Sequence, residues 1–172
     1  MEIKRLHLGG TERKEGWLNM NAIPADNVDL VGDIKNLEFL EENTFQEIYS
    51  SHILEHINQK DALATLKGIN RILKPGGVFY ISVPDLDTLC QLFIHPQLDV
   101  NAKYHVMRMM FGGQVNEFDF HYFGWNFEIL GHFLKDSGFT NVNKVVSHGI
   151  FKDTSDLLVF GVRISLNVQC SK

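Results

Sequence analysis

The sequence predicts an α/β fold with a mainly parallel sheet, and three observations support this. Short stretches of alternating or apolar side chains recur between turns that contain Gly or Pro, as expected for strands. Residues 60–73 carry apolar side chains at helical spacing. Residues 78–83 form a nearly continuous apolar run, which is typical of a strand buried on both faces. Strands that alternate with helices imply parallel pairing through right-handed crossovers.

Four strands are expected in the N-terminal part of the chain, over residues 3–8, 17–20, 28–31 and 45–50. The first of them ends at the turn Gly9-Gly10. Only a short loop follows before the second strand begins. We therefore expect the first helix of such a fold to be absent or reduced to a turn.

The middle of the chain contains the clearest helix. Helix 60–73 should end at Lys74-Pro75-Gly76-Gly77, because Gly closes helices and Pro cannot continue them. After strand 78–83, Pro84-Asp85 should open a second helix that runs to Phe93, with Asp85 as a candidate N-cap.

The C-terminal part begins with a long irregular segment, residues 95–125, with one short helix expected around residues 102–111. Such segments in compact domains are usually functional or mobile, so we expect it on the substrate side of a single domain spanning residues 1–172. Asn126 can cap a helix that runs to Gly138. Residues 140–147 and 156–164 are expected to be the last two strands, forming an antiparallel pair at the sheet edge.

Composition argues against several function classes. The formal net charge is -5 and Lys and Arg are scattered, so nucleic-acid binding is not expected. No apolar stretch approaches membrane-spanning length, and residues 1–10 show no signal peptide. Cys90 and Cys170 fit no metal or redox spacing, and such a chain favours a cytoplasmic location.

The central block carries a family resemblance. Phe45–His56 (FQEIYSSHILEH) is followed by Ile69–Gly77 (INRILKPGG) and Val83–Leu86 (VPDL). Together they resemble the core of class I S-adenosylmethionine (SAM)-dependent methyltransferases of the type 11-like group. The later FGGQ at Phe111–Gln114 and the DFH that ends at His121 are similar to a bacterial subgroup associated with sugar or cell-surface metabolism. The resemblance implies a Rossmann-like sheet, SAM as cofactor and S-adenosyl-L-homocysteine (SAH) as product.

The resemblance also implies a set of cofactor-binding residues. The glycine loop after the first strand is Gly9-Gly10-Thr11 here, where the family usually has Gly-x-Gly. Asn21 stands where the family usually has an acidic residue that binds the ribose. Asp33, followed by Ile34, aligns with the position near the adenine amino group, and Ser50, Ser51 and His52 would line the methionine part. These residues also have structural interpretations. Gly9-Gly10 can be a plain turn, and Asp33 or the two serines can cap helices.

His121 is the first candidate for a catalytic general base, because His titrates near neutral pH and sits in an aromatic-rich stretch. Asp85 and His52 are second candidates. A structural role for His121 is equally compatible with its surroundings. The neighbouring aromatic residues are Phe118, Phe120, Tyr122, Phe123 and Trp125. They can belong to the core or form a wall on which a sugar stacks, and their spacing does not distinguish these two interpretations.

The leading functional hypothesis is methyl transfer from SAM to a small polar acceptor, a sugar or glycan precursor. The departures at Thr11 and Asn21 support an alternative, a catalytically weak or inactive binding module of the same fold. A third hypothesis is a zinc hydrolase, because His52-Ile53-Leu54-Glu55-His56 also matches the H-x-x-E-H pattern. In that case His52 and His56 would share a helix face and bind one ion.

Overall fold

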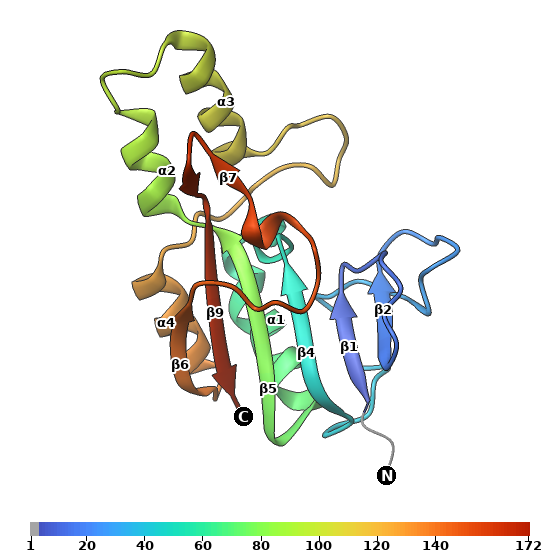
Figure 1. The fold of residues 1–172 in the computed structure, drawn as a ribbon. Helices are drawn as coiled ribbons and strands as arrows, with labels where there is room; N and C mark the ends of the chain where they lie inside the picture. Colours follow the sequence, from blue (N-terminus) through green and yellow to red (C-terminus); the bar gives the residue numbers. More distant parts are fainter. Residues whose placement is uncertain (1–3) are drawn as a thin grey trace.

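The structure is a computed structural model that describes residues 4–172. Ile3 of the first predicted strand and the N-terminal part of the segment inspected for a signal peptide lie outside the described residues. A seven-stranded sheet has the order β3-β2-β1-β4-β5-β9-β6 (Figure 1). Its strands are β1 (Arg5–Leu8), β2 (Trp17–Asn21), β3 (Leu30–Val31), β4 (Phe45–Ser51), β5 (Leu73–Pro84), β6 (Thr140–Val145) and β9 (Ser165–Ser171).

The sheet is mainly parallel, as the sequence predicts. All pairs among the first five strands are parallel, while β9 runs antiparallel to both β5 and β6 at the C-terminal edge. Strand order reverses between β1 and β4, since β2 and β3 lie on one side of β1 and the later strands lie beyond β4. In open α/β sheets this reversal marks the place where ligands bind.

The prediction for the last strand was wrong. Residues 156–164 do not join the main sheet, because Phe160 and Gly161 both have positive φ and turn the chain back on itself. They contain a small hairpin of β7 (Leu158–Val159) and β8 (Val162–Arg163) that follows the short helix η2 (Thr154–Asp156). The strand that pairs with β5 and β6 is β9, which buries Leu166, Val168 and Cys170 on one face.

The helices lie close to their predicted positions. The α-helices are α1 (Gln59–Ile72), α2 (Leu86–Phe93), α3 (Val100–Phe111) and α4 (Phe127–Asp136). Asn58 and Asn126 cap α1 and α4 by accepting hydrogen bonds from the backbone N–H groups of Asp61 and Ile129. The Lys74–Gly77 turn belongs to the start of β5, which is longer than predicted. None of the α-helices of residues 4–172 is long and apolar enough to cross a membrane.

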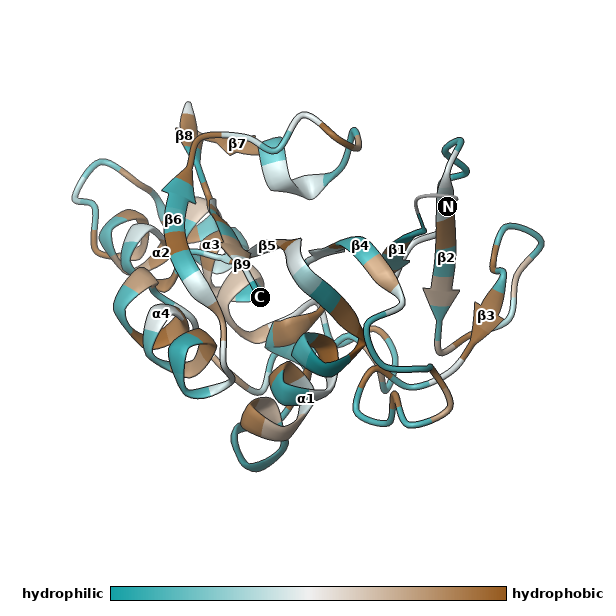
Figure 2. Cartoon of the chain, turned by 90° about the horizontal axis from the view of Figure 1, so that it is seen from below, coloured by the Kyte–Doolittle hydropathy of each residue, from teal (hydrophilic) through white to brown (hydrophobic). Residues whose placement is uncertain are grey.

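Among residues 4–172, α-helices cover only one face of the sheet. α1 and α4 pack on the same side, whereas α2 and α3 lie beyond the carboxyl ends of the central strands (Figures 1 and 2). Within the described part of the chain, no helix connects β1 to β2, β2 to β3 or β3 to β4. The predicted loss of the first helix is therefore confirmed, and the opposite face has to be covered in another way.

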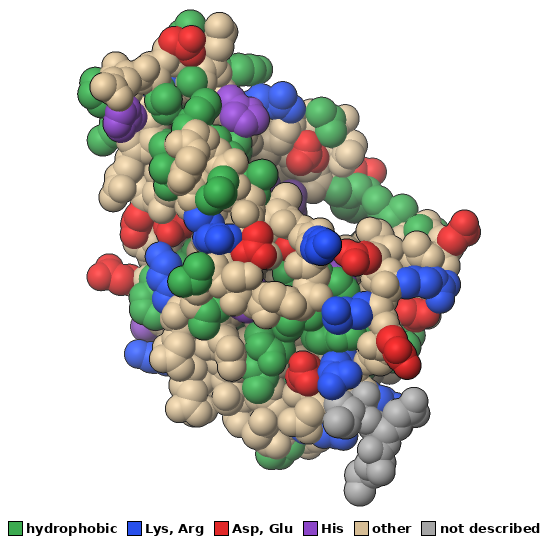
Figure 3. Space-filling model, viewed as in Figure 1, with side chains coloured by type: hydrophobic (Ala, Val, Ile, Leu, Met, Phe, Trp, Pro, Cys, Tyr) green, Lys and Arg blue, Asp and Glu red, His purple; other side chains and the backbone are tan. Residues whose placement is uncertain are grey.

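The cover on that face is the first part of the segment between β6 and β9, residues 146–157, which we call the strap. Phe151 from the strap packs against His7, Tyr49 and Trp17, with ring centroids 4.1, 5.0 and 5.3 Å away. The Tyr49 hydroxyl donates a 2.7 Å hydrogen bond to the Asp153 carboxylate. Asn167 of β9 donates to the strap carbonyls of Val146 and Ser155, each at 3.0 Å. The rest of this face, seen in Figure 3, intersperses positive and negative side chains without a single-sign patch.

The packing of the strap changes the titration of two side chains of the sheet. Burial lowers the pKa of His7 to about 4, and the Asp153 carboxylate only partly opposes this. Burial also raises the pKa of Tyr49, which stays a neutral hydrogen-bond donor. His7 is therefore buried in its neutral form, and its protonation has to oppose folding.

Acidification should destabilise the protein through His7. Its folded pKa lies below the unfolded value of 6.5, so its contribution is complete above pH 6.5 and is lost as pH falls toward 4. Across this window the difference in the free energy of unfolding between wild type and His7→Leu should change by about 3 kcal/mol, measured by urea denaturation. His132→Asn, which alters an exposed imidazole, should keep the wild-type pH dependence. A wild-type minus His7→Leu difference that is flat between pH 4 and 6.5 would contradict this assignment.

Candidate functional site

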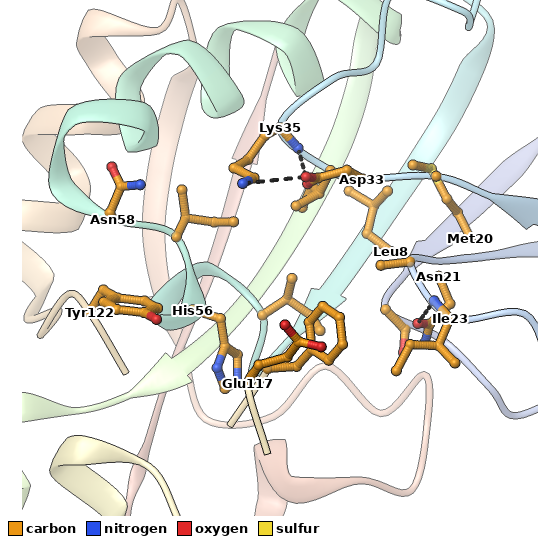
Figure 4. Close-up of a pocket in the computed structure, with 17 residues that line it drawn as sticks. Leu8, Met20, Asn21, Ile23, Asp33, Lys35, His56, Asn58, Glu117 and Tyr122 are labelled. Carbon is orange, nitrogen blue, oxygen red and sulfur yellow. Dashed lines mark hydrogen bonds and ion pairs between the residues drawn. The ribbon is translucent and has the colours of Figure 1, made fainter. Parts of the chain in front are cut away.

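A pocket of about 570 Å³ lies at the carboxyl ends of β1, β2 and β3, beside the segment that follows β4 (Figure 4). This is the point where strand order reverses. Four of the predicted cofactor residues line it together: Gly9, Asn21, Asp33 and Ile34. The other lining residues are Leu8, Met20, Ala22, Ile23, Gly32, Lys35, Ile53, His56, Ile57, Asn58, Glu117, Phe118 and Tyr122.

Gly9 forms the floor of the pocket in a conformation that favours glycine. Its φ is +77°, and a Cβ at this position would overlap the Ile53 side chain. Its backbone N–H donates to the Met20 carbonyl at 2.7 Å, which holds the loop against β2. Gly10 is buried and lies outside the pocket lining, with the His7 ring where its Cβ would be. The loop therefore presents Gly9 to the pocket and packs Gly10 against the sheet.

Asn21 links the first two loops of the pocket. Its amide Nδ2 donates to the Gly9 carbonyl at 3.1 Å, and its Oδ1 accepts from the Ile23 backbone N–H at 3.0 Å. Asp33 belongs to the third loop, where Oδ1 accepts from the Lys35 backbone N–H and Oδ2 lies 3.4 Å from Lys35 Nζ. About half of the Asp33 side chain is exposed, so its carboxylate is accessible to a ligand.

Ser50, Ser51 and His52 do not line this pocket. The chain turns at His52, which has a φ of +53°, and its imidazole points to Ser165, with Nε2 2.9 Å from Oγ. The side chains that reach the pocket come from the next residues, Ile53, His56 and Ile57, which the prediction missed. Contact of Ser50, Ser51 and His52 with the methionine part of SAM stays a prediction.

Asp85 lies in a different, smaller pocket with Lys144, Arg163 and Ser165. It occupies the predicted N-cap position of α2, but its carboxylate caps no helix N–H group and instead lies 3.3 Å from Lys144 Nζ. The capping prediction is therefore wrong for the side chain, because the ion pair draws it away from the helix. A catalytic role for Asp85 stays a prediction, and the geometry favours His121 over it.

His121 is held by the end of α3. Its Nδ1 lies 2.9 Å from the Met109 carbonyl, and its backbone N–H donates to the Phe111 carbonyl at 3.2 Å. Burial lowers the pKa of His121, which the nearby Glu55 carboxylate partly opposes. Its ring lies 4.8 Å from the ring of His56, which lines the pocket. The structure thus brings His121 to the edge of the pocket next to His56.

The FGGQ and DFH motifs form one tight loop that places His121. Gly112 has a φ of +82° and lies so close to Asp119 that a Cβ would overlap the Asp119 carbonyl. Gln114 then donates its backbone N–H to that carbonyl at 3.0 Å. Gly112 therefore serves chain geometry, and the loop returns His121 to α3.

Four of the aromatic residues around His121 divide into two groups. Phe123 and Trp125 belong to the core and stack on each other with centroids 4.0 Å apart. Phe118 and Tyr122 are more than half exposed and line the pocket. The core interpretation therefore holds for Phe123 and Trp125, while stacking of a sugar on Phe118 and Tyr122 stays a prediction.

Glu55 is a buried charged residue that the sequence prediction missed. Its side chain is 2% exposed, and neither carboxylate oxygen has a hydrogen-bond donor among the described residues. Its carboxylate, His56 and His121 offer ligand-type atoms that all lie within 4.8 Å of one another. The Leu54-Glu55-His56 motif was the available signal, since a carboxylate in the middle of the helical turn η1 (Leu54–His56) has to face either solvent or the core.

The comparisons with known proteins agree with this geometry. Residues 10–81, less than half of the chain, match the family described as a methyltransferase domain. Among solved structures, a SAM-dependent methyltransferase from Archaeoglobus fulgidus has a TM-score of 0.63 and 14% identity over 99% of this chain and 86% of that one. The chain has the fold of a class I SAM-dependent methyltransferase.

Two further structures show the same fold. The S-adenosylmethionine-dependent methyltransferase of Mesorhizobium loti has a TM-score of 0.61 and 15% identity, over 99% of this chain and 91% of that one. A putative methyltransferase of Haloferax volcanii, solved in complex with the Trm112 methyltransferase activator, has a TM-score of 0.59 and 15% identity, over 99% and 82%. No curated protein matches the chain.

These matches support a methyltransferase that uses SAM, and nothing in them points to a zinc hydrolase. The geometry also disfavours that hypothesis, because His52 precedes η1 in a left-handed conformation and shares no helix face with His56. The pocket residues fit SAM, since Asp33 offers an accessible acceptor between apolar walls.

Replacement of Gly9 tests the pocket floor. Gly9→Ala adds both a strained φ and an overlap with Ile53, so SAH affinity should fall at least about tenfold, measured by calorimetric titration. Gly76→Ala is the matched control, because Gly76 also has a positive φ (+74°) but open space around its Cβ and lies outside the pocket. Each variant should lose about 1 kcal/mol of stability from backbone strain. Unchanged SAH affinity in Gly9→Ala would show that the ligand does not approach this loop.

Proposed function

We propose that the protein transfers a methyl group from SAM to a hydroxyl of a small polar acceptor, a sugar or glycan precursor. The observation that carries the proposal is the convergence of Gly9, Asn21 and Asp33 on one pocket at the strand-order reversal. His56 and His121 stand at the edge of the same pocket. A cytoplasmic location, favoured by the two free thiols, is part of the proposal.

On the cofactor side, the loops that carry Gly9, Asn21 and Asp33 contribute differently to SAM binding. Gly9 allows close approach of the backbone, and Asp33 accepts hydrogen bonds from ribose or adenine donors. Ile23 and Ile34 supply apolar surface for a flat base. Asn21 is neutral and its Oδ1 already accepts from Ile23, so it contributes less than a carboxylate would, by about 1 kcal/mol.

On the acceptor side, the chain provides a base and an aromatic surface. SAM, when bound, supplies an electrophilic methyl group, and the electron pair of the broken carbon–sulfur bond stays on sulfur in SAH. His121 has its Nδ1 engaged by the Met109 carbonyl, which leaves Nε2 to accept the proton that the acceptor hydroxyl loses. Phe118 and Tyr122 offer exposed rings on which a sugar can stack. A polar acceptor held between these rings and the imidazoles accounts for both features.

Ligand-induced stabilisation tests the cofactor assignment. SAH at 100 times its Kd should raise the free energy of unfolding by about 2.7 kcal/mol, visible as a higher Tm. Asp33→Ala should abolish this shift without unfolding the protein, because its exposed carboxylate contributes little to the core. Asp26→Ala is the control, since Asp26 is exposed and lies outside the pocket. No shift with SAM or SAH in the wild type would support the binding-module alternative instead.

Substitution of His121 tests the acceptor side. SAH release from SAM can be measured with a panel of nucleotide sugars and free oligosaccharides as acceptors. His121→Ala should lower the turnover found with the best acceptor by about 10²–10⁴-fold, while its SAH-induced Tm shift stays as in the wild type. His132→Ala, on the outer face of α4, should behave like the wild type. Full turnover in His121→Ala would remove His121 from the mechanism.

A further inference from the structure

Three side chains of different segments converge beside the pocket in a way that the methyl-transfer proposal leaves unexplained. Glu55 and His56 come from η1, and His121 comes from the loop after α3, 65 residues later in the chain. Their ligand-type atoms lie within 4.8 Å of one another. Ligand atoms around one tetrahedral ion lie about 3.4 Å apart, so side-chain adjustments of about 1 Å would close the site.

Both imidazoles are oriented by backbone carbonyls. His56 Nδ1 lies 3.0 Å from the Phe120 carbonyl and His121 Nδ1 lies 2.9 Å from the Met109 carbonyl. A carbonyl only accepts, so each Nδ1 carries the proton and each Nε2 presents a lone pair. This arrangement, in which the second nitrogen is fixed by an outer acceptor, is the usual support of a metal-binding histidine.

The Glu55 carboxylate gives the independent indication. It is almost completely buried, yet neither oxygen receives a hydrogen bond from any residue between 4 and 172. His52 Nδ1 lies 3.2 Å from Oε1, without the geometry of a hydrogen bond. Removing a carboxylate from water without donors or a cation costs several kcal/mol, and burial among ligand-type atoms fits coordination of a cation.

We propose that Glu55, His56 and His121 bind one divalent transition-metal cation at the wall of the pocket. Two imidazole nitrogens and one carboxylate suit Mn²⁺, Fe²⁺, Co²⁺ or Zn²⁺ better than Mg²⁺ or Ca²⁺, which prefer oxygen ligands. Three protein ligands leave coordination positions for a further molecule. His56 lines the pocket (Figure 4), so an acceptor hydroxyl that enters the pocket comes next to these positions.

This site deepens the proposed function and rests on it for its use in catalysis. A bound cation lowers the pKa of a coordinated hydroxyl, so the proton passes to solvent and the acceptor oxygen is ready for methylation. In this arrangement His121 is a metal ligand. The cation, and not His121, then promotes the loss of the hydroxyl proton. The site differs from the zinc-hydrolase hypothesis, because it uses Glu55 and His121 and keeps His52 outside the ligand set.

Metal titration of the full chain, prepared without a polyhistidine tag and treated with chelator, tests the site directly. Calorimetric titration with Mn²⁺ and Zn²⁺ should show one equivalent per chain, and Co²⁺ should give a d–d absorption band. Glu55→Gln and His121→Asn should each weaken binding at least about tenfold. His132→Asn is the matched control, because it removes an exposed imidazole whose Nε2 lies 3.5 Å from the Asp136 carboxylate.

Folding of the variants is checked separately, so that loss of binding is interpretable. Without metal, Glu55→Gln should melt at or above the wild-type temperature, because it removes a buried charge that lacks donors. With 1 mM Mn²⁺ or Zn²⁺, the wild type should gain Tm and Glu55→Gln should not. Absence of stoichiometric binding of Mn²⁺, Zn²⁺ and Co²⁺, or binding unchanged in Glu55→Gln and His121→Asn, overturns the site.

The two proposals fail in different ways. Metal binding without any SAH-induced Tm shift would reject SAM-dependent methyl transfer and leave the cation site in place. SAH binding and methyl transfer that persist in excess chelator would reject the catalytic part of the cation proposal and leave His121 as the base. Turnover that is lost with chelator and restored by Mn²⁺ or Zn²⁺ would support both.

Discussion

The carbonyl of Glu55 accepts two backbone hydrogen bonds, from Tyr122 at 2.8 Å and Phe123 at 3.2 Å, and the rest of the site depends on this connection. It joins the short helix after β4 to a segment more than sixty residues later. His56 reinforces it through the Phe120 carbonyl, and Trp125 continues it by accepting the N–H of Leu86. The irregular segment after α3 is thereby fixed at the carboxyl ends of the strands, and it carries Phe118, His121 and Tyr122 to the pocket.

This connection matters because the N-terminal half of the sheet has few other supports. Where helices would connect the first strands, this chain has short loops, so one face of the sheet is left to the strap. Phe151 and Asp153 of the strap cover His7 and Tyr49, which keeps β1 and β4 adjacent. The strand-order reversal, and with it the floor of the pocket at Gly9, is stabilised from the face opposite to α1.

The absence of helices between the first described strands also affects how the cofactor loops are held. With no helix after β1, the Gly9 loop is held by Met20 and by the Asn21 amide. An aspartate at position 21 could not donate to the Gly9 carbonyl, because a carboxylate only accepts. The departure from the family pattern at Asn21 therefore has a structural use, in which its amide replaces part of the support that a helix N-terminus would give. The cost is a weaker partner for ribose hydroxyls.

The sequence by itself determined six strands of the sheet, the four α-helices to within two residues and four residues of the pocket. Alternation, helical spacing and turn residues act over a few positions, and Gly9, Asn21, Asp33 and Ile34 follow strands directly, so topology alone brings them together. Residues 156–164 were misassigned because their apolar run hides a reversal at Phe160-Gly161. Only the tertiary structure decided that Asp85 pairs with Lys144, that Phe118 and Tyr122 face the pocket while Trp125 is core, and that Glu55, His56 and His121 meet. These outcomes depend on contacts between segments about sixty residues apart, or on the direction of single side chains, and no local pattern in the sequence encodes them.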